Sequence, residues 1–266
     1  MRFLHAGQMI LYKSIVLWYH KDRKIHTERG KPMLYVMSDL HGEYEKYRKM
    51  LELIRFSDAD ELFVLGDVVD RGAQPIEILL DMMARPNVYP IMGNHDAFAF
   101  YMMQKLAVTI TQENAGTHLA TEDMQDLIGW LQDGGSSTMA GFQKLSQEQR
   151  ADVLQYLEDM PYYETVDVGE RTYILVHAGL ANFRPDRKLS SYLPEELLLG
   201  RHDPDERYFA DPDVWVIAGH TPTQMISGKP EIYHGDQIFM IDCGACQPGG
   251  RLGCLCLDTL GEFYIE

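Results

Sequence analysis

The stretch LFVLGDVVDRG, residues 62–72, decides the fold. It opens with a short apolar run, Leu62–Leu65, and a polar segment, Gly66–Gly72, follows at once. A short continuous apolar run bounded by glycine or polar residues is typical of a strand in the interior of a sheet. The stretch therefore predicts a buried strand that ends in a polar loop containing Asp67, Asp70 and Arg71.

Apolar runs of the same kind lie on both sides of this strand. Segments with helical spacing, Tyr44–Ile54 and Ile76–Ala84, separate the first three runs. Alternating strands and helices are the signature of a parallel sheet, so we predict an α/β fold. The runs that we interpret as strands are Leu34–Met37, Leu62–Leu65, Val88–Met92, Tyr173–Val176, Val214–Ala218 and Ile238–Ile241, and we expect a terminal hairpin over Leu252–Leu257 and Glu262–Ile265.

The middle of the chain, residues 97–160, has no good strand pattern. Asp123–Leu131 and Glu148–Met160 have helical spacing, and the run Gly134–Ser137 reads as a loop. We interpret this region as a mainly helical insertion in the domain and not as a separate domain.

The first 32 residues differ in charge from the rest. They hold seven Lys or Arg against two Asp or Glu, a net charge of +5, which leaves −21 for the remainder of a chain whose formal charge is −16. A strand pattern begins directly after Met33. We therefore expect residues 1–32 to be an N-terminal extension, or a segment upstream of the true start, and residues 33–266 to form the domain.

The composition limits the partners of the chain. Its 266 residues are 45% hydrophobic and 24% charged, as in ordinary globular proteins. A charge of −16 argues against binding nucleic acid, which usually needs a basic surface. No apolar run is long enough to span a membrane and no signal peptide is clear, so we expect a cytoplasmic protein without a membrane partner. The oligomeric state is left open.

Polar side chains follow five of the predicted strands. Ligands in open α/β sheets gather at the carboxyl ends of the strands, so these five segments are expected to meet at one place. Any one of them alone would more often be a turn, a helix cap or a satisfied core residue. The five segments are Asp39–His41, Gly66–Gly72, Gly93–Asp96, His177–Gly179 and Gly219–Pro222.

The five segments, in this order, resemble those of the calcineurin-like metallophosphoesterases. The resemblance is strongest to their phosphoprotein phosphatase branch, which includes bacterial and phage serine/threonine phosphatases, and it covers residues 34 to about 260. It implies a metallophosphoesterase-type β-sandwich flanked by helices, with the helical insertion at about residues 97–160. It also implies hydrolysis of phosphate esters by a hydroxide that bridges two metal ions.

The resemblance implies a ligand for each metal position. Asp39 and His41 would bind one ion, Asp67 would bridge both, and the second site would be completed by Asn94, His177 and His220. Mixed carboxylate, imidazole and amide ligands suit manganese, iron or zinc better than calcium, and manganese is the expected metal. Two divalent ions against two carboxylates would leave the centre about +2, enough to attract a phosphate dianion to an acidic chain.

The same resemblance implies catalytic roles. His95 would be the general acid that protonates the leaving group, and Asp70 would orient its ring. Arg71 would clamp phosphate oxygens, with Asn94 beside it. Arg201, in a segment that matches the family only loosely, would be a second clamp; the alternative is a solvated arginine of a loop.

Three functions remain open. The first is a phosphatase of phosphoserine or phosphothreonine in proteins, because Asp70–Gly72 and Gly219–Pro222 look like protein phosphatases. The alternative is a symmetrical diadenosine tetraphosphate hydrolase, because Gly93–Asp96 and His177–Leu180 look more like that branch. Separately, Asp96 departs mildly from the glutamate that the protein phosphatases usually have at this position. The third is a non-catalytic metal-binding scaffold, which is disfavoured because none of the six implied ligands is missing.

Four cysteines require a separate interpretation. Cys243 and Cys246 have the C-x-x-C spacing of a zinc site, and Cys254 and Cys256 alternate on a predicted strand. Cysteines on one face of a strand usually behave as small buried hydrophobic residues, so we favour core packing over zinc binding. Disulfides are not expected without a secretory signal.

Overall fold

The computed structural model describes residues 32–107, 121–201 and 203–266. Residues 33–266 form one compact unit. The expected extension, residues 1–32, lies almost wholly outside the described residues. Within the described ranges, no helix is long and apolar enough to cross a membrane.

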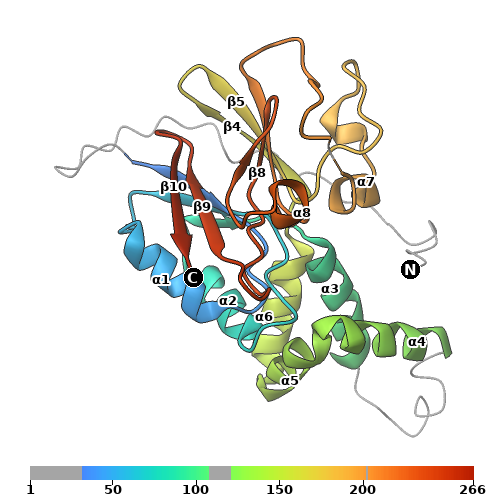
Figure 1. The fold of residues 1–266 in the computed structure, drawn as a ribbon. Helices are drawn as coiled ribbons and strands as arrows, with labels where there is room; N and C mark the ends of the chain where they lie inside the picture. The colour runs from blue at the N-terminus through green and yellow to red at the C-terminus, as the bar shows by residue number, and fades with distance from the viewer. Residues whose placement is uncertain (1–31, 108–120, 202) are drawn as a thin grey trace, which may run out of the picture. The chain divides into compact units, whose positions relative to one another are not determined.

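The described residues contain two five-stranded mixed sheets (Figure 1). The first sheet has the order β10-β9-β1-β2-β3. The strands β1, β2 and β3 are parallel, β9 is antiparallel to β1, and β10 is antiparallel to β9. Its strands are β1 (Leu34–Met37), β2 (Glu61–Val64), β3 (Val88–Pro90), β9 (Leu252–Cys256) and β10 (Gly261–Ile265).

The second sheet has the order β4-β5-β6-β8-β7, with β5, β6 and β8 parallel. Its strands are β4 (Tyr163–Val168), β5 (Arg171–Val176), β6 (Val214–Ala218), β7 (Tyr233–His234) and β8 (Ile238–Met240). The sequence did not predict β4, because its exposed positions hold charged residues and its apolar residues are few. Among the described residues it pairs only with β5, so it lies at the edge of the described sheet, where polar residues are tolerated.

Apolar side chains of the two sheets share one core. Val36 of β1 and Phe63 of β2 pack in the same cluster as Leu175 of β5 and Ile217 of β6. Successive strand residues point to opposite faces of the sheet, so Tyr35 and Met37 of β1 pack on the other face, in a cluster with the helices. The expected sandwich of two sheets flanked by helices is confirmed.

Helices cover the outer faces of both sheets. The helices α1 (Tyr44–Leu53) and α2 (Pro75–Met83) pack their apolar faces in the cluster of the first sheet, and Figure 1 shows them on the side away from β4 and β5. The proline that opens α2 has its φ fixed near the helical value. On the second sheet, α7 (Pro194–Leu198) contributes to the outer cluster, and α8 (Gln224–Ser227) follows β6.

The insertion is mainly helical, as predicted. Its helices are α3 (Asn94–Ala107), α4 (Thr121–Trp130), α5 (Ser136–Lys144) and α6 (Gln147–Glu158). The prediction of a loop at Gly134–Ser137 is wrong, because a π-helical turn, Leu131–Gly135, runs directly into α5. The chain bends inside that turn at Gly134, whose φ is 105°.

Candidate metal centre

The loops that leave the strands have an unusual backbone. Positive φ is uncommon outside glycine and costs roughly 1–3 kcal/mol for a residue held there, and such residues concentrate at functional sites. Backbone hydrogen bonds hold the first two loops side by side, from Asp39 N to Gly66 O (3.1 Å) and from His41 N to Asp67 O (2.8 Å). The positive-φ residues of the five polar segments are Asp39 (53°), His41 (42°), Asp67 (51°), Asp70 (69°), Arg71 (66°) and His220 (64°).

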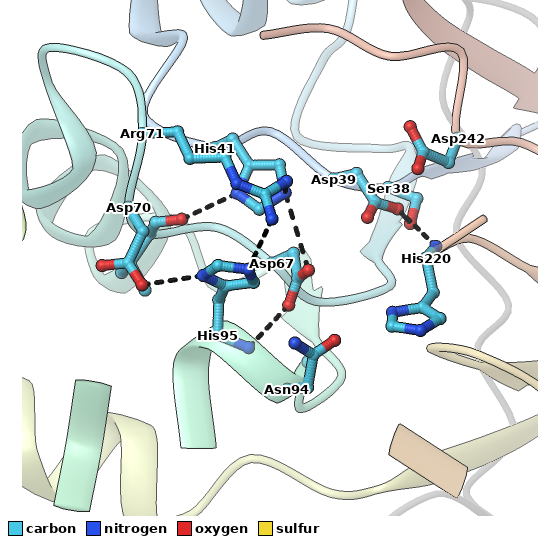
Figure 2. A network of polar contacts seen from close by, with 12 residues as sticks. Ser38, Asp39, His41, Asp67, Asp70, Arg71, Asn94, His95, His220 and Asp242 are labelled. Atoms are coloured by element: carbon cyan, nitrogen blue, oxygen red, sulfur yellow. Dashed lines mark hydrogen bonds and ion pairs between the residues drawn. The ribbon is translucent and has the colours of Figure 1, made fainter. Parts of the chain in front are cut away.

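Asp67 lies at the centre of the site (Figure 2). Its carboxylate belongs to two compact groups of possible metal ligands, one with His41 and His95 and the other with His177 and His220. The Nε2 atoms of His41 and His177 lie 3.6 Å and 3.5 Å from different oxygens of this carboxylate. Asp67 thus has the position that a bridging ligand would need.

Glycine at position 93 makes room for that carboxylate. A Cβ atom on Gly93 would lie 2.4 Å from Asp67 Oδ1 and 2.2 Å from Asp67 N. Any other residue would therefore displace Asp67, so Gly93 is required by the site and not by a turn alone.

Two histidine rings are oriented by backbone carbonyls. Nδ1 of His41 lies 3.0 Å from Val69 O, and Nδ1 of His177 lies 2.7 Å from Leu65 O. A ring that donates Nδ1–H to a carbonyl leaves the lone pair of Nε2 facing the other way, here toward Asp67. This is the usual arrangement of a histidine that binds a metal.

Burial favours the neutral forms of His41, His220 and Asp39. Burial and the nearby charge of Arg71 lower the pKa of His41 well below its usual value. Burial and the neighbouring His177 lower the pKa of His220 to about 3. Burial also raises the pKa of Asp39 to about 6, with Asp67 adding to the effect. Neutral rings beside carboxylates that resist losing their protons form a ligand set that a cation would stabilise.

Asp39 and Asn94 lie at the site but outside the two compact groups. Asp39 Oδ2 accepts hydrogen bonds from the Ser38 hydroxyl and from His220 N (2.9 Å). Asn94 Oδ1 lies 2.9 Å from His177 Nε2, so the amide and the ring present their ligand atoms together. Sequence reasoning did not single out Ser38, whose hydroxyl fixes one oxygen of Asp39.

Arg71 reaches into the site. Its two terminal nitrogens lie 2.8 Å from His41 Nε2 and 2.8 Å from His95 Nε2. Asp133, from the insertion, pairs with it at 3.5 Å and lies 3.8 Å from His95 Nε2. Arg201 is exposed, and its charge helps burial and His177 to lower the pKa of His220.

His95 and Asp70 form a pair. Nδ1 of His95 lies 2.8 Å from Asp70 Oδ2. Burial disfavours the charged ring, but the hydrogen bond to Asp70 and the charge of Asp67 together raise the pKa of His95 to about 8. Asp70 is fully buried and receives further hydrogen bonds from Trp130 and Thr138 of the insertion.

Asp96 joins two of the loops. Its buried carboxylate accepts hydrogen bonds from Val68 N (3.0 Å) and Gly93 N (3.1 Å). The shorter acid at this position therefore ties the loop after β2 to the start of α3, which gives the departure from the family's glutamate a structural role.

The cysteines mostly pack in the core. Cys243, Cys254 and Cys256 are buried, and all four cysteines are free. Cys246 is half-buried and interacts electrostatically with Arg71. Among the residues that the structure describes, the possible metal groups contain no cysteine.

The donor chemistry fits a pair of transition-metal ions. Two clusters share one carboxylate, burial lowers the pKa of His41 and of His220, and the Nε2 atoms of His41 and His177 face Asp67. Imidazole and carboxylate together suit manganese, iron or zinc.

Residues 33–240 match the family described as calcineurin-like phosphoesterase. The chain is 33% identical over 99 residues to the symmetrical bis(5'-nucleosyl)-tetraphosphatase of Shewanella loihica, a match that covers 36% of each chain. The chain thus spans about a third of the length of this relative. It is 23% identical over 247 residues to the asymmetrical bis(5'-nucleosyl)-tetraphosphatase of Geobacillus sp. strain WCH70, covering 82% of this chain and 87% of that protein.

A solved structure has a similar fold. It is provisionally named a diadenosine tetraphosphatase, and it aligns with 88% of this chain and 93% of its own at a TM-score of 0.60. Its sequence identity is 17%, so the likeness concerns the fold alone.

Proposed function

Because the chain belongs to the calcineurin-like phosphoesterase family, we propose that it is a metal-dependent hydrolase that cleaves dinucleoside polyphosphates such as diadenosine tetraphosphate. The family membership predicted from the five polar segments is confirmed. The observation that supports hydrolysis is the pair of ligand clusters sharing Asp67. The relatives named above, which are dinucleoside tetraphosphatases, support the substrate class.

The ligand roles form part of the proposal. One ion would be held by Asp39, His41 and Asp67, and the other by Asp67, Asn94, His177 and His220. Bound there, such ions would polarise phosphoryl oxygens and make a water molecule acidic enough to attack at neutral pH. Manganese is the first metal to test, followed by iron and zinc.

The chain's own residues would orient the substrate and move the proton. Arg71 places its forked guanidinium beside the rings of His41 and His95, and the two terminal nitrogens would donate two hydrogen bonds to a bound phosphate. His95 would give the proton on Nε2 to the departing oxygen, while Asp70 holds Nδ1. Arg201 is proposed as a second phosphate contact because its charge acts on the His220 ring.

A second candidate, hydrolysis of phosphate monoesters such as phosphoserine or phosphothreonine, is favoured by one observation. The ring of His95 is fixed by a buried carboxylate. A positioned general acid contributes most when the leaving group is a poor one, such as an alkoxide, and less when a nucleotide phosphate departs. The His95–Asp70 pair therefore supports the phosphatase hypothesis, which stays a prediction.

Steady-state kinetics of the metal-loaded protein separates the functions. We expect kcat/KM for diadenosine tetraphosphate to exceed that for a phosphoserine peptide by roughly tenfold or more, since a site that holds a second nucleotide discriminates strongly against substrates lacking it. Two ADP would indicate symmetrical cleavage, and ATP with AMP asymmetrical cleavage. A preference for the peptide would favour the phosphatase. Two bound ions without hydrolysis of either substrate would favour the scaffold.

A further inference from the structure

The Asp70 carboxylate receives more hydrogen bonds than the His95 pair requires. Besides His95 at Oδ2 (2.8 Å), Trp130 donates its Nε1–H to the same oxygen at 2.9 Å and lies 3.1 Å from Oδ1. The Thr138 hydroxyl donates to Oδ1 at 2.6 Å. Asp70 is fully buried, and so is Thr138, so these contacts exclude water from the carboxylate.

Both additional donors come from the helical insertion. Trp130 is the last residue of α4, and Thr138 lies in the first turn of α5, 60 and 68 residues beyond Asp70 in the chain. Thr138 Oγ1 also accepts from Asp70 N at 2.9 Å, so the same hydroxyl fixes the backbone and the carboxylate. The insertion thus holds a residue whose φ of 69° the β2–α2 loop would not adopt freely.

The turn between Trp130 and Thr138 holds the next residue of that loop. Gly134 O accepts a hydrogen bond from Arg71 N at 2.9 Å. A Cβ on Gly134 would lie 2.8 Å from Arg71 N, so the turn approaches Arg71 as closely as a glycine permits. The insertion therefore contacts both Asp70 and Arg71 through a short segment, residues 130–138.

We propose that Trp130 and Thr138 are positioning residues, which hold the Asp70 carboxylate, and through it the His95 ring, in the orientation for proton donation. The inference rests on the proposed role of His95 in the hydrolysis. It makes the helical insertion a part of the catalytic apparatus in addition to any part in selecting substrate.

The physical reason is the cost of a mobile buried carboxylate. With His95 as its single partner, the carboxylate could rotate about its Cβ–Cγ bond, and the ring would follow it. Donors on both oxygens remove that freedom. Loss of one donor leaves a buried acceptor unsatisfied, which the carboxylate can relieve only by moving.

Matched substitutions remove each donor with little change of shape. Trp130→Phe removes the ring N–H, and Thr138→Val replaces the hydroxyl by a methyl group. Trp215→Phe and Thr172→Val are the controls, because Trp215 donates to Pro212 O at 3.1 Å and Thr172 donates to the Asp167 carboxylate at 2.7 Å, on the surface. Thr138→Ser keeps the hydroxyl and should restore activity if Thr138→Val loses it.

The readout is the dependence of kcat on the leaving group. General acid catalysis contributes roughly 10²–10⁴-fold, so partial misorientation of His95 should lower kcat for phenyl phosphate about tenfold. For 2,4-dinitrophenyl phosphate, whose leaving group needs no proton, kcat should change less than about twofold, and KM for both should stay within about twofold. Equal losses on the two substrates, or no loss on either, would overturn the proposal.

A spectroscopic measurement tests the same proposal without activity. In the zinc-loaded parent protein, whose metal is diamagnetic, the His95 Nδ1 proton should give a low-field resonance, assigned by its absence in His95→Asn. We expect this resonance to shift upfield or disappear in Trp130→Phe and Thr138→Val, and to persist in Thr138→Ser and in both controls. An unchanged resonance in the two variants would overturn the inference. A parent protein that hydrolyses no phosphate ester would instead overturn the proposed function, and the resonance would still decide the positioning.

Discussion

Asp67 is the residue on which both halves of the proposed centre depend. Its two oxygens face different histidines, and it is buried among them. Loss of a residue that only supports a metal ligand typically costs 10–100-fold in metal affinity, so loss of a shared ligand should cost more than about 100-fold. We predict that Asp67→Asn purifies without a full metal complement and without activity.

Elemental analysis after dialysis measures that loss. Asp133→Asn is the matched control, because Asp133 lies at the same site but is partly exposed and belongs to neither cluster among the described residues. An Asp67→Asn protein that retained its metals would contradict the bridging role.

The raised pKa of Asp39 leads us to predict that metal binding releases protons. In the metal-free protein, burial raises the pKa of Asp39 to about 6, and burial with the charge of Asp67 raises the pKa of Asp96 to about 7. A raised pKa means that the folded, metal-free protein retains these protons until the pH rises through those values. A bound cation favours the ionised carboxylates, so metal binding expels these protons. We therefore expect proton release on metal binding to be larger at pH 6 than at pH 8.

Calorimetric titration with manganese in buffers of different ionisation enthalpy measures this release. Proton uptake at pH 6, or heats that do not depend on the buffer, would disagree with the prediction. The same titration of Asp39→Asn should release fewer protons.

The site residues that could be predicted from the sequence are those that follow a strand. Asp67 and His177 each stand directly beyond an apolar run, so their convergence followed from the topology. Trp130 and Thr138 gave no such signal, because they lie in a helical region and gain a role only through a carboxylate more than 50 residues away. The Gly134–Gly135 pair beside them was a usable sign of close backbone approach, which we read as a loop.

At the scale of elements, the turn between α4 and α5 fixes the β2–α2 loop. We predict that Gly134→Ala raises KM for phosphate esters about tenfold, because its Cβ would displace the Arg71 backbone and turn the guanidinium away from phosphate. The matched control is Gly169→Ala, since Gly169 also has positive φ (65°) but nothing within 4 Å of the added Cβ.

Both alanine variants carry the backbone cost of positive φ, which lowers the free energy of unfolding by about 1 kcal/mol. Steady-state kinetics and urea unfolding of the two proteins separate that cost from the displacement of Arg71. Equal KM values in Gly134→Ala and the parent would show that the turn does not position Arg71.

The elements themselves were predictable where burial dictated their pattern. The interior strands β1, β2, β5 and β6 each contain a continuous apolar run. The strand β4 was not predicted, because an edge strand needs few apolar residues. Its pairing depends on β5 and not on its own sequence pattern. Local sequence therefore predicted every strand of the first sheet and the interior strands of the second, and it missed the second sheet's edge strands β4 and β7.

At the scale of the whole molecule, a strongly acidic chain is proposed to take a polyanionic substrate. The formal charge is −16, and the local positive charge at the centre would have to overcome it. Raising the ionic strength from about 0.01 M to about 0.15 M shortens the Debye length from about 30 Å to about 8 Å, which screens the repulsion more than contacts inside the site. We predict that kcat/KM for diadenosine tetraphosphate then rises a few-fold.

An aryl phosphate carries fewer charges and should respond less to the same change in salt. Initial rates at limiting substrate, with the free metal concentration held constant, measure both dependences. A decrease of kcat/KM with salt would mean that the local positive charge governs capture of the substrate.

The contact between Asp39 Oδ2 and His220 N joins residues 181 positions apart in the chain. It sets an order of assembly during synthesis on the ribosome. The cluster of His41, Asp67 and His95 is complete once the first 95 residues have emerged, whereas the cluster with His177 and His220 must wait until the chain has reached β6 and beyond. A nascent chain can therefore bring His41, Asp67 and His95 together early, but the group with His177 and His220 and the final position of Asp39 form only when the second sheet closes against the first.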